Sequence, residues 1–193
     1  MSGHSLIARA ASCLIVIDVQ QYFLDKLPLH ERGPLVARIA WLMRVARLLD
    51  IPIVATAEDM AQDGPMVAAL VAELPAGAQV FDKMVFGLMG QADIRDAVAA
   101  TGRRECVLVG LETDVCVAHS ALGLLDAGYR VAAVSDATGT PPPHQEAGLQ
   151  RMAQAGVTIT NTKGIYYEWV RDLATDARIR PQLNRDLPAG LTL

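Results

Sequence analysis

A cysteine at position 116 lies where a predicted buried strand, a short loop and a helix meet. The strand covers residues 106–109, and the helix begins near residue 114. In a parallel α/β sheet this junction lies at the carboxyl edge of the strands, where ligands usually bind. The N-terminus of a helix favours negative charge, so a thiol there ionises more easily. The position therefore predicts that Cys116 is a nucleophile.

Two more polar residues, Asp18 and Lys83, come at or directly after the ends of predicted strands. If these strands are neighbours in the sheet, both side chains meet Cys116 at one edge. A nucleophilic thiol needs a base, and Asp18 could be that base if burial raises its pKa. Lys83 would lower the pKa of the thiol and hold the carboxylate by charge. Each has an ordinary alternative, since Asp18 could cap a loop, Lys83 could be a solvated charge, and the two could form a structural ion pair.

Other chemistry is less favoured by the sequence. His119 follows Cys116 by three residues on about the same helix face, but helical side chains lean toward the N-terminus, so a core or interface role is favoured over a base. Glu58, Asp59 and Asp63 could hold a metal through oxygen ligands alone, yet a plain acidic loop explains them better. Neither glycine-rich nucleotide-binding motif is present. We therefore expect no metal and no cofactor.

The elements that must position these residues alternate along the chain. Continuous apolar runs, rather than alternating ones, predict strands covered on both faces, as in a parallel sheet. Strands alternating with helices predict a layered α/β fold with right-handed crossovers. We expect strands at residues 13–19, 51–57, 79–82, 106–109, 130–135 and 157–160, and helices at 34–49, 66–74, 92–100, 114–127, 144–155 and 164–173. Pro34 is expected at a helix start, after a loop, and the tail after Arg178 is expected to be surface-packed.

Composition restricts the partners and the compartment. Hydrophobic residues make up 52% of the 193 residues and charged residues 20%, which argues against disorder. The net charge of −4 and the absence of a basic run give no reason to expect a nucleic acid or a membrane as partner. No apolar run is long enough for a bilayer span or a signal peptide, so a cytoplasmic location is expected. With three cysteines, a disulfide framework is not expected, and Cys13 and Cys106 are predicted to be buried.

Four segments of the chain resemble the isochorismatase-like cysteine hydrolases. They are residues 14–20, 83–87, 109–117 and 134–137. The resemblance rests on the combination of the pattern G-x-x-T-x-x-C-V at residues 110–117, an upstream D-x-Q at residues 18–20 at a predicted strand end, and a lysine between them. Each piece alone is weak, whereas the combination is specific, and the resemblance covers about residues 13–172.

The resemblance implies a Rossmann-like three-layer α/β/α fold with a six-stranded parallel sheet, and residues 1–193 as a single hydrolase domain. It implies a catalytic triad of Asp18, Lys83 and Cys116 and a cis peptide between Leu111 and Glu112. The backbone amides of Glu112 and Cys116 would then form an oxyanion hole. Members of the family are commonly homo-oligomers, so a dimer or tetramer is expected.

The resemblance also narrows the reaction. The matching stretch at residues 57–60 lacks the histidine of the metal-dependent nicotinamidases, which disfavours that branch. The presence of Cys116 favours cleavage of an amide-type C–N bond of a small molecule through a Cys thioester, with Tyr22, Phe23 and Phe86 as candidate pocket walls. One alternative is vinyl-ether hydrolysis that uses Asp18 without covalent cysteine chemistry. Another is a catalytically idle oligomeric binding protein.

Overall fold

The sheet at the centre of the molecule is parallel throughout and has the strand order β3-β2-β1-β4-β5-β6 over the described residues. The computed structural model describes residues 6–184 and 187–193. The strands are β1 (Ser12–Ile17), β2 (Ile53–Glu58), β3 (Val80–Lys83), β4 (Glu105–Leu111), β5 (Arg130–Gly139) and β6 (Thr158–Thr160). This confirms the predicted six-stranded parallel sheet. The chain reverses its direction of winding between β1 and β4, and ligands bind at such a switch point in open α/β sheets.

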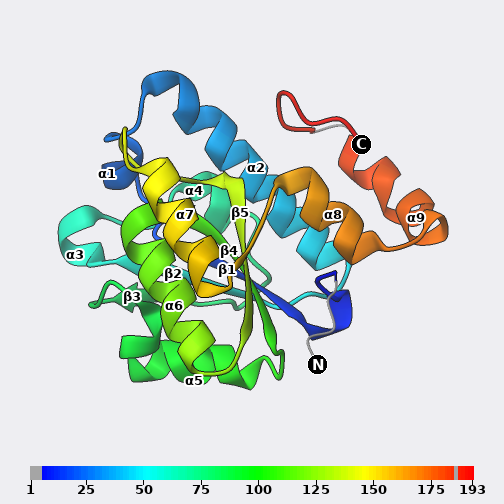
Figure 1. Cartoon of the computed structure of the whole chain (residues 1–193). Helices are drawn as coiled ribbons and strands as arrows, with labels where there is room; N and C mark the ends of the chain where they lie inside the picture. Colours follow the sequence, from blue (N-terminus) through cyan, green and yellow to red (C-terminus); the bar gives the residue numbers. More distant parts are fainter. Residues whose placement is uncertain (1–5, 185–186) are drawn as a thin grey trace.

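Helices cover both faces of the sheet and complete three layers (Figure 1). One face carries α2 (Leu29–Leu48), α4 (Ala68–Val71), α8 (Thr162–Val170) and α9 (Leu173–Leu183). The other carries α5 (Ala92–Ala100), α6 (Ala118–Asp126) and α7 (Gln145–Ala155). Shorter helical segments are η1 (Arg9–Ala11), α1 (Gln21–Leu24), α3 (Met60–Asp63), η2 (Leu88–Gly90) and η3 (Thr113–Val117).

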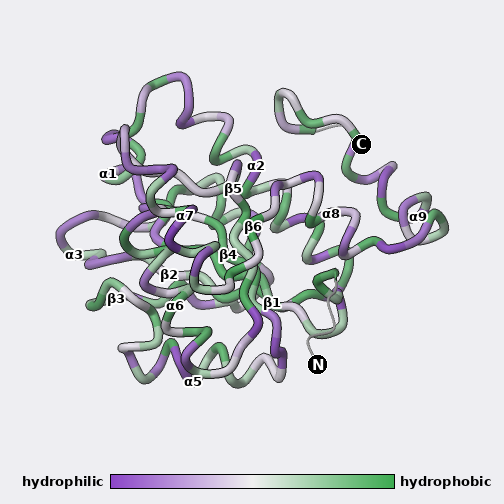
Figure 2. Tube along the Cα trace, in the orientation of Figure 1, coloured by the Kyte–Doolittle hydropathy of each residue, from purple (hydrophilic) through white to green (hydrophobic). Residues whose placement is uncertain are grey.

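Alternate residues of the central strands supply two separate cores. In β1, Leu14 and Val16 pack under α2, whereas Cys13, Ile15 and Ile17 pack on the opposite face. All five are fully buried, which is why β1 reads as an unbroken apolar run. The hydrophobic middle and hydrophilic rim are visible in Figure 2. Burial of both faces fixes the register of the strands and thereby the side chains at their ends.

Several predicted element boundaries are wrong. Helix α2 begins at Leu29, so Pro34 lies inside it, in the second turn, where its missing N–H costs one intrahelical bond. The predicted helix at residues 164–173 is instead α8, which ends at Val170, followed by α9 (Leu173–Leu183), whose N-cap Asp172 accepts a hydrogen bond from the Thr175 amide at 2.8 Å. Strand β5 continues to Gly139, beyond the predicted end at residue 135. Contacts of α2 with β1 and β5, and pairing of β5 with β4 as far as Gly139, accompany the extension of α2 and β5 past their local sequence signals.

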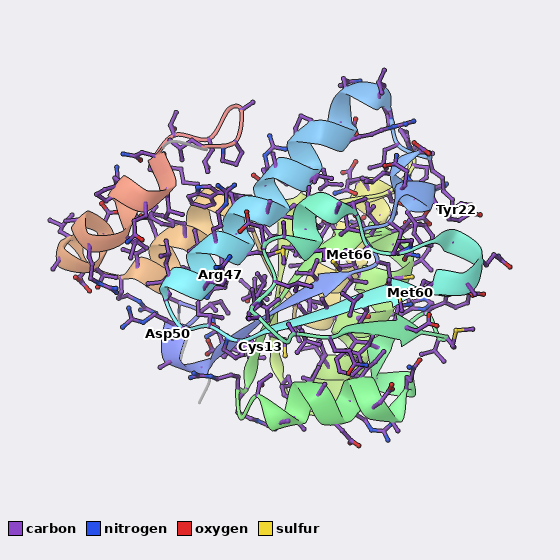
Figure 3. The ribbon with its side chains drawn as sticks, turned by 180° about the vertical axis from the view of Figure 1, so that it is seen from behind. Cys13, Tyr22, Arg47, Asp50, Met60 and Met66 are labelled. Carbon is purple, nitrogen blue, oxygen red and sulfur yellow. The ribbon has the colours of Figure 1, made fainter. Side chains whose placement is uncertain are left out.

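The polar ends of the strands lie together at one edge. Figure 3 shows α2 crossing the sheet, with Arg47, Asp50 and Cys13 toward the amino ends of the strands and Tyr22, Met60 and Met66 toward the carboxyl ends. None of the helices in the described ranges is both long and apolar enough to cross a membrane.

Candidate active site

Four side chains from four neighbouring strand ends meet at the carboxyl edge of the sheet. The ammonium of Lys83, at the end of β3, lies 3.0 Å from Oδ2 of Asp18 and 2.8 Å from Oε2 of Glu58. Its Nζ is also 3.8 Å from Sγ of Cys116. The three residues predicted from the sequence therefore do lie together, and Glu58 joins them. We call these four residues the strand-end cluster.

Asp18 is the most enclosed carboxylate of the strand-end cluster. It is fully buried directly after β1, and its backbone has a φ of 51°, a left-handed conformation that Asp tolerates better than most residues. Its Oδ1 accepts a hydrogen bond from Oγ1 of Thr56 at 2.8 Å. Burial raises the pKa of Asp18 to about 6, although the positive charge of Lys83 opposes the shift. Asp18 can therefore exchange a proton near neutral pH.

Lys83 keeps its charge although its side chain is fully buried. Burial alone would lower its pKa, but the charges of Asp18 and Cys116 and the hydrogen bond to Glu58 raise it above its usual value. Its Nζ also donates to the Val85 carbonyl at 2.6 Å. Ligand atoms of Asp18, Glu58 and Cys116 lie within 4.8 Å of one another, a spacing that could suit a metal. The ammonium already provides a cation at this position.

Cys116 lies in η3, a single π-helical turn between β4 and α6, and is 3% exposed. Its Sγ donates to Oε2 of Glu58 at 3.1 Å. Burial raises the pKa of the thiol, the charge of Asp18 adds to this, and the charge of Lys83 offsets only part of the effect. The easier ionisation expected from the helix N-terminus is therefore opposed by burial and by two carboxylates that face one ammonium.

The loop before Cys116 is held tightly from several sides. The peptide bond between Leu111 and Glu112 is cis. Gly110 has a φ of 124°, and a Cβ at this position would overlap the backbone carbonyl of Ile17 in β1. The Glu112 carbonyl accepts hydrogen bonds from the amides of Val115 at 3.2 Å and Val117 at 3.1 Å.

Side chains from outside the loop complete its support. Oγ1 of Thr113 donates to Oε1 of Gln145, at the start of α7, at 2.7 Å. Nζ of Lys26 lies 3.3 Å from Oε1 of Glu112. The same ammonium lies over the rings of Tyr22 and Phe23, at 4.3 and 4.4 Å from their centroids. These contacts tie the loop to elements on both faces of the sheet.

A cavity of about 160 Å³ adjoins the strand-end cluster. Phe86, one of the predicted pocket walls, lines it and is 58% exposed. The other two predicted walls, Tyr22 and Phe23, are not among its lining residues. Tyr22 is 48% exposed, and Phe23 is buried in the core. The exposed His119 ring packs edge-on against Phe86, with 6.3 Å between the ring centroids. The cavity is lined by Glu58, Asp59, Lys83, Met84, Val85 and Phe86.

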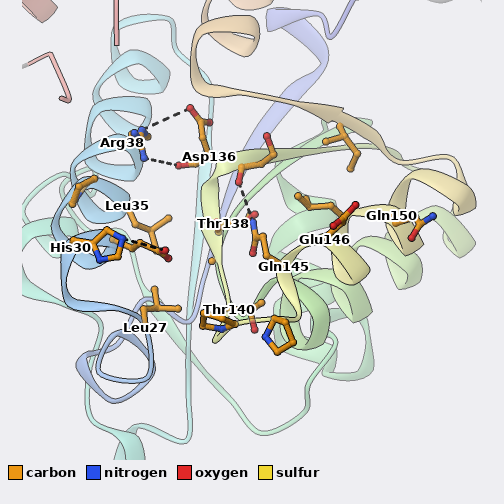
Figure 4. Close-up of a pocket in the computed structure, with 18 of the residues that line it drawn as sticks. Leu27, His30, Leu35, Arg38, Asp136, Thr138, Thr140, Gln145, Glu146 and Gln150 are labelled. Carbon is orange, nitrogen blue, oxygen red and sulfur yellow. Dashed lines mark hydrogen bonds and ion pairs between the residues drawn. The ribbon is translucent and has the colours of Figure 1, made fainter. Parts of the chain in front are cut away.

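A larger groove of about 950 Å³ lies elsewhere, between α2 and α7 above β5 (Figure 4). Arg38 on the α2 side approaches Asp136, with 3.8 Å between Nε and Oδ2, and Gln145 on the α7 side donates to the Thr138 carbonyl at 3.2 Å. None of the strand-end cluster lines this groove. Size alone therefore does not identify the reactive site.

Glu58 is the site residue that the sequence reasoning missed. The predicted second strand ended at Ala57, which assigned Glu58 to an acidic loop, whereas β2 ends at Glu58 itself. A signal was present, since Glu58 follows an apolar run in the same way as Asp18. Its two acidic neighbours behave differently. Asp59 caps α3 by accepting from the Gln62 amide, and Asp63 lies within that helix.

Comparison with known proteins places this arrangement in a family. The isochorismatase domain model matches residues 12–164. The secreted isochorismatase effector Isc1 of Phytophthora sojae is 32% identical over 171 residues, which cover 84% of this chain and 78% of Isc1. YcaC of Escherichia coli, named a probable hydrolase, is 27% identical over 167 residues, which cover 86% of this chain and 80% of YcaC.

Solved structures agree with the sequence comparisons. YcaC from Pseudomonas aeruginosa, solved with hexane-2,5-diol and covalent acrylamide, superposes with a TM-score of 0.90 at 26% identity. The alignment covers 98% of this chain and 95% of that one. The Escherichia coli YcaC structure, described as an octameric hydrolase of unknown specificity, gives a TM-score of 0.89 at 24% identity over 96% of this chain and 92% of that one. The chain therefore belongs to the isochorismatase family of hydrolases, as the sequence motifs predicted.

Proposed function

We propose that this hydrolase cleaves an amide-type C–N bond of a small molecule through a thioester on Cys116. The observation that carries the proposal is the contact set of the thiol, which is hydrogen-bonded to a carboxylate at 3.1 Å and lies 3.8 Å from a buried ammonium. A nucleophile, a proton acceptor and a compensating charge are what acyl transfer to a thiol requires.

In this proposal Asp18, Lys83 and Cys116 are the catalytic residues. The thiol gives its proton to a carboxylate of the strand-end cluster while sulfur attacks the substrate carbonyl. Lys83 balances the negative charge, and Asp18 holds the ammonium in place. The proton then passes to the leaving nitrogen, the C–N bond breaks, and a water molecule that loses a proton to a carboxylate releases the acyl group.

The backbone amides of Glu112 and Cys116 serve as the oxyanion hole in this proposal. Both belong to the loop that Gly110 and Gln145 hold in place. A preorganised donor aimed at the developing charge typically contributes about 3–4 kcal/mol to transition-state stabilisation.

Two observations support a small substrate. A cavity of about 160 Å³ adjoins the cluster, which is close to the roughly 150 Å³ of an engineered cavity that holds benzene. The Pseudomonas aeruginosa relative was solved with covalent acrylamide, so a molecule of this size can react within that protein. We therefore take small aliphatic amides as the substrate class to test first.

The test is turnover of a panel of small amides, with mass-spectrometric detection of an acyl adduct on Cys116. Cys116→Ala should abolish both turnover and adduct. Full activity of this variant would overturn the mechanism. If Asp18→Asn were then inactive, the result would favour vinyl-ether hydrolysis, and an inactive wild type without any adduct would favour an idle scaffold.

We also propose that the chain forms a homo-oligomer, a dimer or a tetramer. Escherichia coli YcaC is described as an octamer. In this chain, Met84, Val85 and Phe86 are consecutive exposed apolar residues beside the cavity. Light scattering after size-exclusion chromatography tests the proposal, and a monomer at micromolar concentration would contradict it.

A further inference from the structure

The thiol of Cys116 has one carboxylate partner within hydrogen-bonding distance, and that partner is Glu58. Its Oε2 accepts the thiol hydrogen at 3.1 Å and the Lys83 ammonium at 2.8 Å. Among the hydrogen bonds of the described residues, none joins the thiol to Asp18. The two oxygens of Asp18 face Thr56 at 2.8 Å and Lys83 at 3.0 Å instead.

Hydrogen bonds from one side chain hold both backbone polar groups of Glu58. The side chain of Gln20, which is fully buried, accepts from the Glu58 amide and donates to the Glu58 carbonyl, both at 2.7 Å. The same amide nitrogen of Gln20 also donates to the Gly64 carbonyl at 2.7 Å. Glu58 is thus held in register with Asp18, which lies two residues before Gln20, so its carboxylate has a defined place beside the thiol.

Glu58 also reaches the space where a substrate would bind. Its side chain is 17% exposed and lines the 160 Å³ cavity, whereas the side chain of Asp18 has no exposed surface. A group that contacts both the thiol and the cavity can receive a proton from sulfur and pass it to a leaving group. Among the described residues, Asp18 has no hydrogen bond to the thiol, and it does not line the cavity.

Charge counting points to a proton that stays inside the cluster. With Asp18, Glu58 and Lys83 ionised and Cys116 neutral, the formal charge is −1. Loss of the thiol proton to solvent would make it −2 in a buried place, which low dielectric surroundings penalise. Transfer of that proton to Glu58 leaves the charge at −1. The favoured route to a thiolate is therefore internal.

We propose that Glu58 is a fourth catalytic residue and acts as the general base for Cys116. The S–H bond breaks, an O–H bond forms on Oε2 of Glu58, and sulfur bonds to the carbonyl carbon while the carbonyl electron pair moves onto oxygen. When the C–N bond breaks, Glu58 returns the proton to nitrogen. This inference rests on the proposed function, because it assigns a base to the same nucleophile.

Acrylamide alkylation of Cys116, followed by mass spectrometry between pH 5 and pH 10, tests this proposal without a known substrate. For the wild type we expect a rate that is flat across neutral pH, because the thiolate forms by internal transfer. For Glu58→Gln we expect a rate lower by about 10²-fold or more at pH 7. That rate should rise about tenfold per pH unit, as ionisation of a free thiol requires.

The sign of the effect separates a base from a mere neighbouring charge. If Glu58 only repelled the thiolate, Glu58→Gln would ease ionisation and speed alkylation, and that result would overturn the proposal. Asp63→Asn is the matched control, since Asp63 is a nearby carboxylate within α3 that does not line the cavity, and it should keep the wild-type profile. Glu58→Asp, which retains a carboxylate, should retain a flat region at a lower rate, and circular dichroism checks that each variant is folded.

Failure of this inference differs from failure of the proposed function. If wild-type Cys116 forms an adduct and Glu58→Gln forms it equally fast, only the role of Glu58 is lost. If Asp18→Asn alone removes the flat region, Asp18 is the base. If the folded wild type forms no adduct on Cys116 anywhere in the pH range, the nucleophile itself, and with it the proposed function, is wrong.

Discussion

Replacement of Gln20 by Ala should be among the most destabilising changes near the site. Three backbone groups depend on this side chain, namely the amide and carbonyl of Glu58 and the carbonyl of Gly64, each at 2.7 Å. A buried polar group left without a partner costs about 1–3 kcal/mol. Because a water molecule can enter the vacated space, we expect a total loss of about 3–6 kcal/mol rather than the full sum.

Urea denaturation followed by circular dichroism measures this loss. With a slope of about 2 kcal/mol per molar, the midpoint should fall by about 1.5–3 M. Gln21→Ala is the matched control, because the neighbouring side chain is exposed and donates to the exposed Asp25. It should change stability by about 0.5 kcal/mol or less. If the midpoints of the two variants agree, the side chain of Gln20 does not hold the end of β2, and the reasoning about Glu58 loses its support.

Three further predictions concern backbone space, charge and capping. Gly110→Ala should lower the melting temperature far more than Gly102→Ala. Both glycines have positive φ, but a Cβ at Gly110 would meet a backbone carbonyl, whereas a Cβ at Gly102 would meet nothing within 4 Å. Equal losses in melting temperature would contradict this. Because the pKa of Asp18 is raised to about 6 from 3.8, its contribution to folding stability is full below pH 3.8 and is lost as pH rises through 6. The free energy of unfolding of Asp18→Asn minus that of the wild type, measured by urea melts, should therefore rise by on the order of 3 kcal/mol between pH 4 and pH 7. If this difference stays constant with pH, the shift in the pKa of Asp18 is refuted. Asn161→Ala removes the N-cap of α8, whose side chain accepts a hydrogen bond from the Gly164 amide at 2.7 Å, and should lower the free energy of unfolding by about 1 kcal/mol in thermal melts. An unchanged stability would contradict a role for this cap.

Much of the fold was predictable because it depends on local pattern. Unbroken apolar runs such as residues 13–17 mark strands buried on both faces, and alternation with helices implies a parallel sheet. The ends of elements were less predictable. Pro34 is a helix-breaking signal that packing of α2 on β1 and β5 overrides, and the weak helical signal after Asp172 is supported by packing of α9 on α2 and α8.

Within the site, the sequence by itself determined which groups stand at strand ends. Asp18 and Cys116 come after apolar runs and Lys83 ends a short strand, and the parallel arrangement of these strands brings the side chains to one edge. Only the tertiary structure decided how the charges balance there. Two carboxylates share one ammonium around the thiol, and burial then raises the pKa of Cys116 instead of lowering it.

The placement of Glu58 beside the thiol likewise depends on the tertiary structure. The position of Glu58 after an apolar run is a local signal that it shares with Asp18, but the acidic residues that follow it, Asp59 and Asp63, belong to α3 and its cap, so the sequence does not separate Glu58 from them. What distinguishes it is the side chain of Gln20, which reaches across from the end of β1 and fixes the end of β2. Hydrogen bonds between residues 38 positions apart depend on sheet register, and register is set by the packing of the whole core.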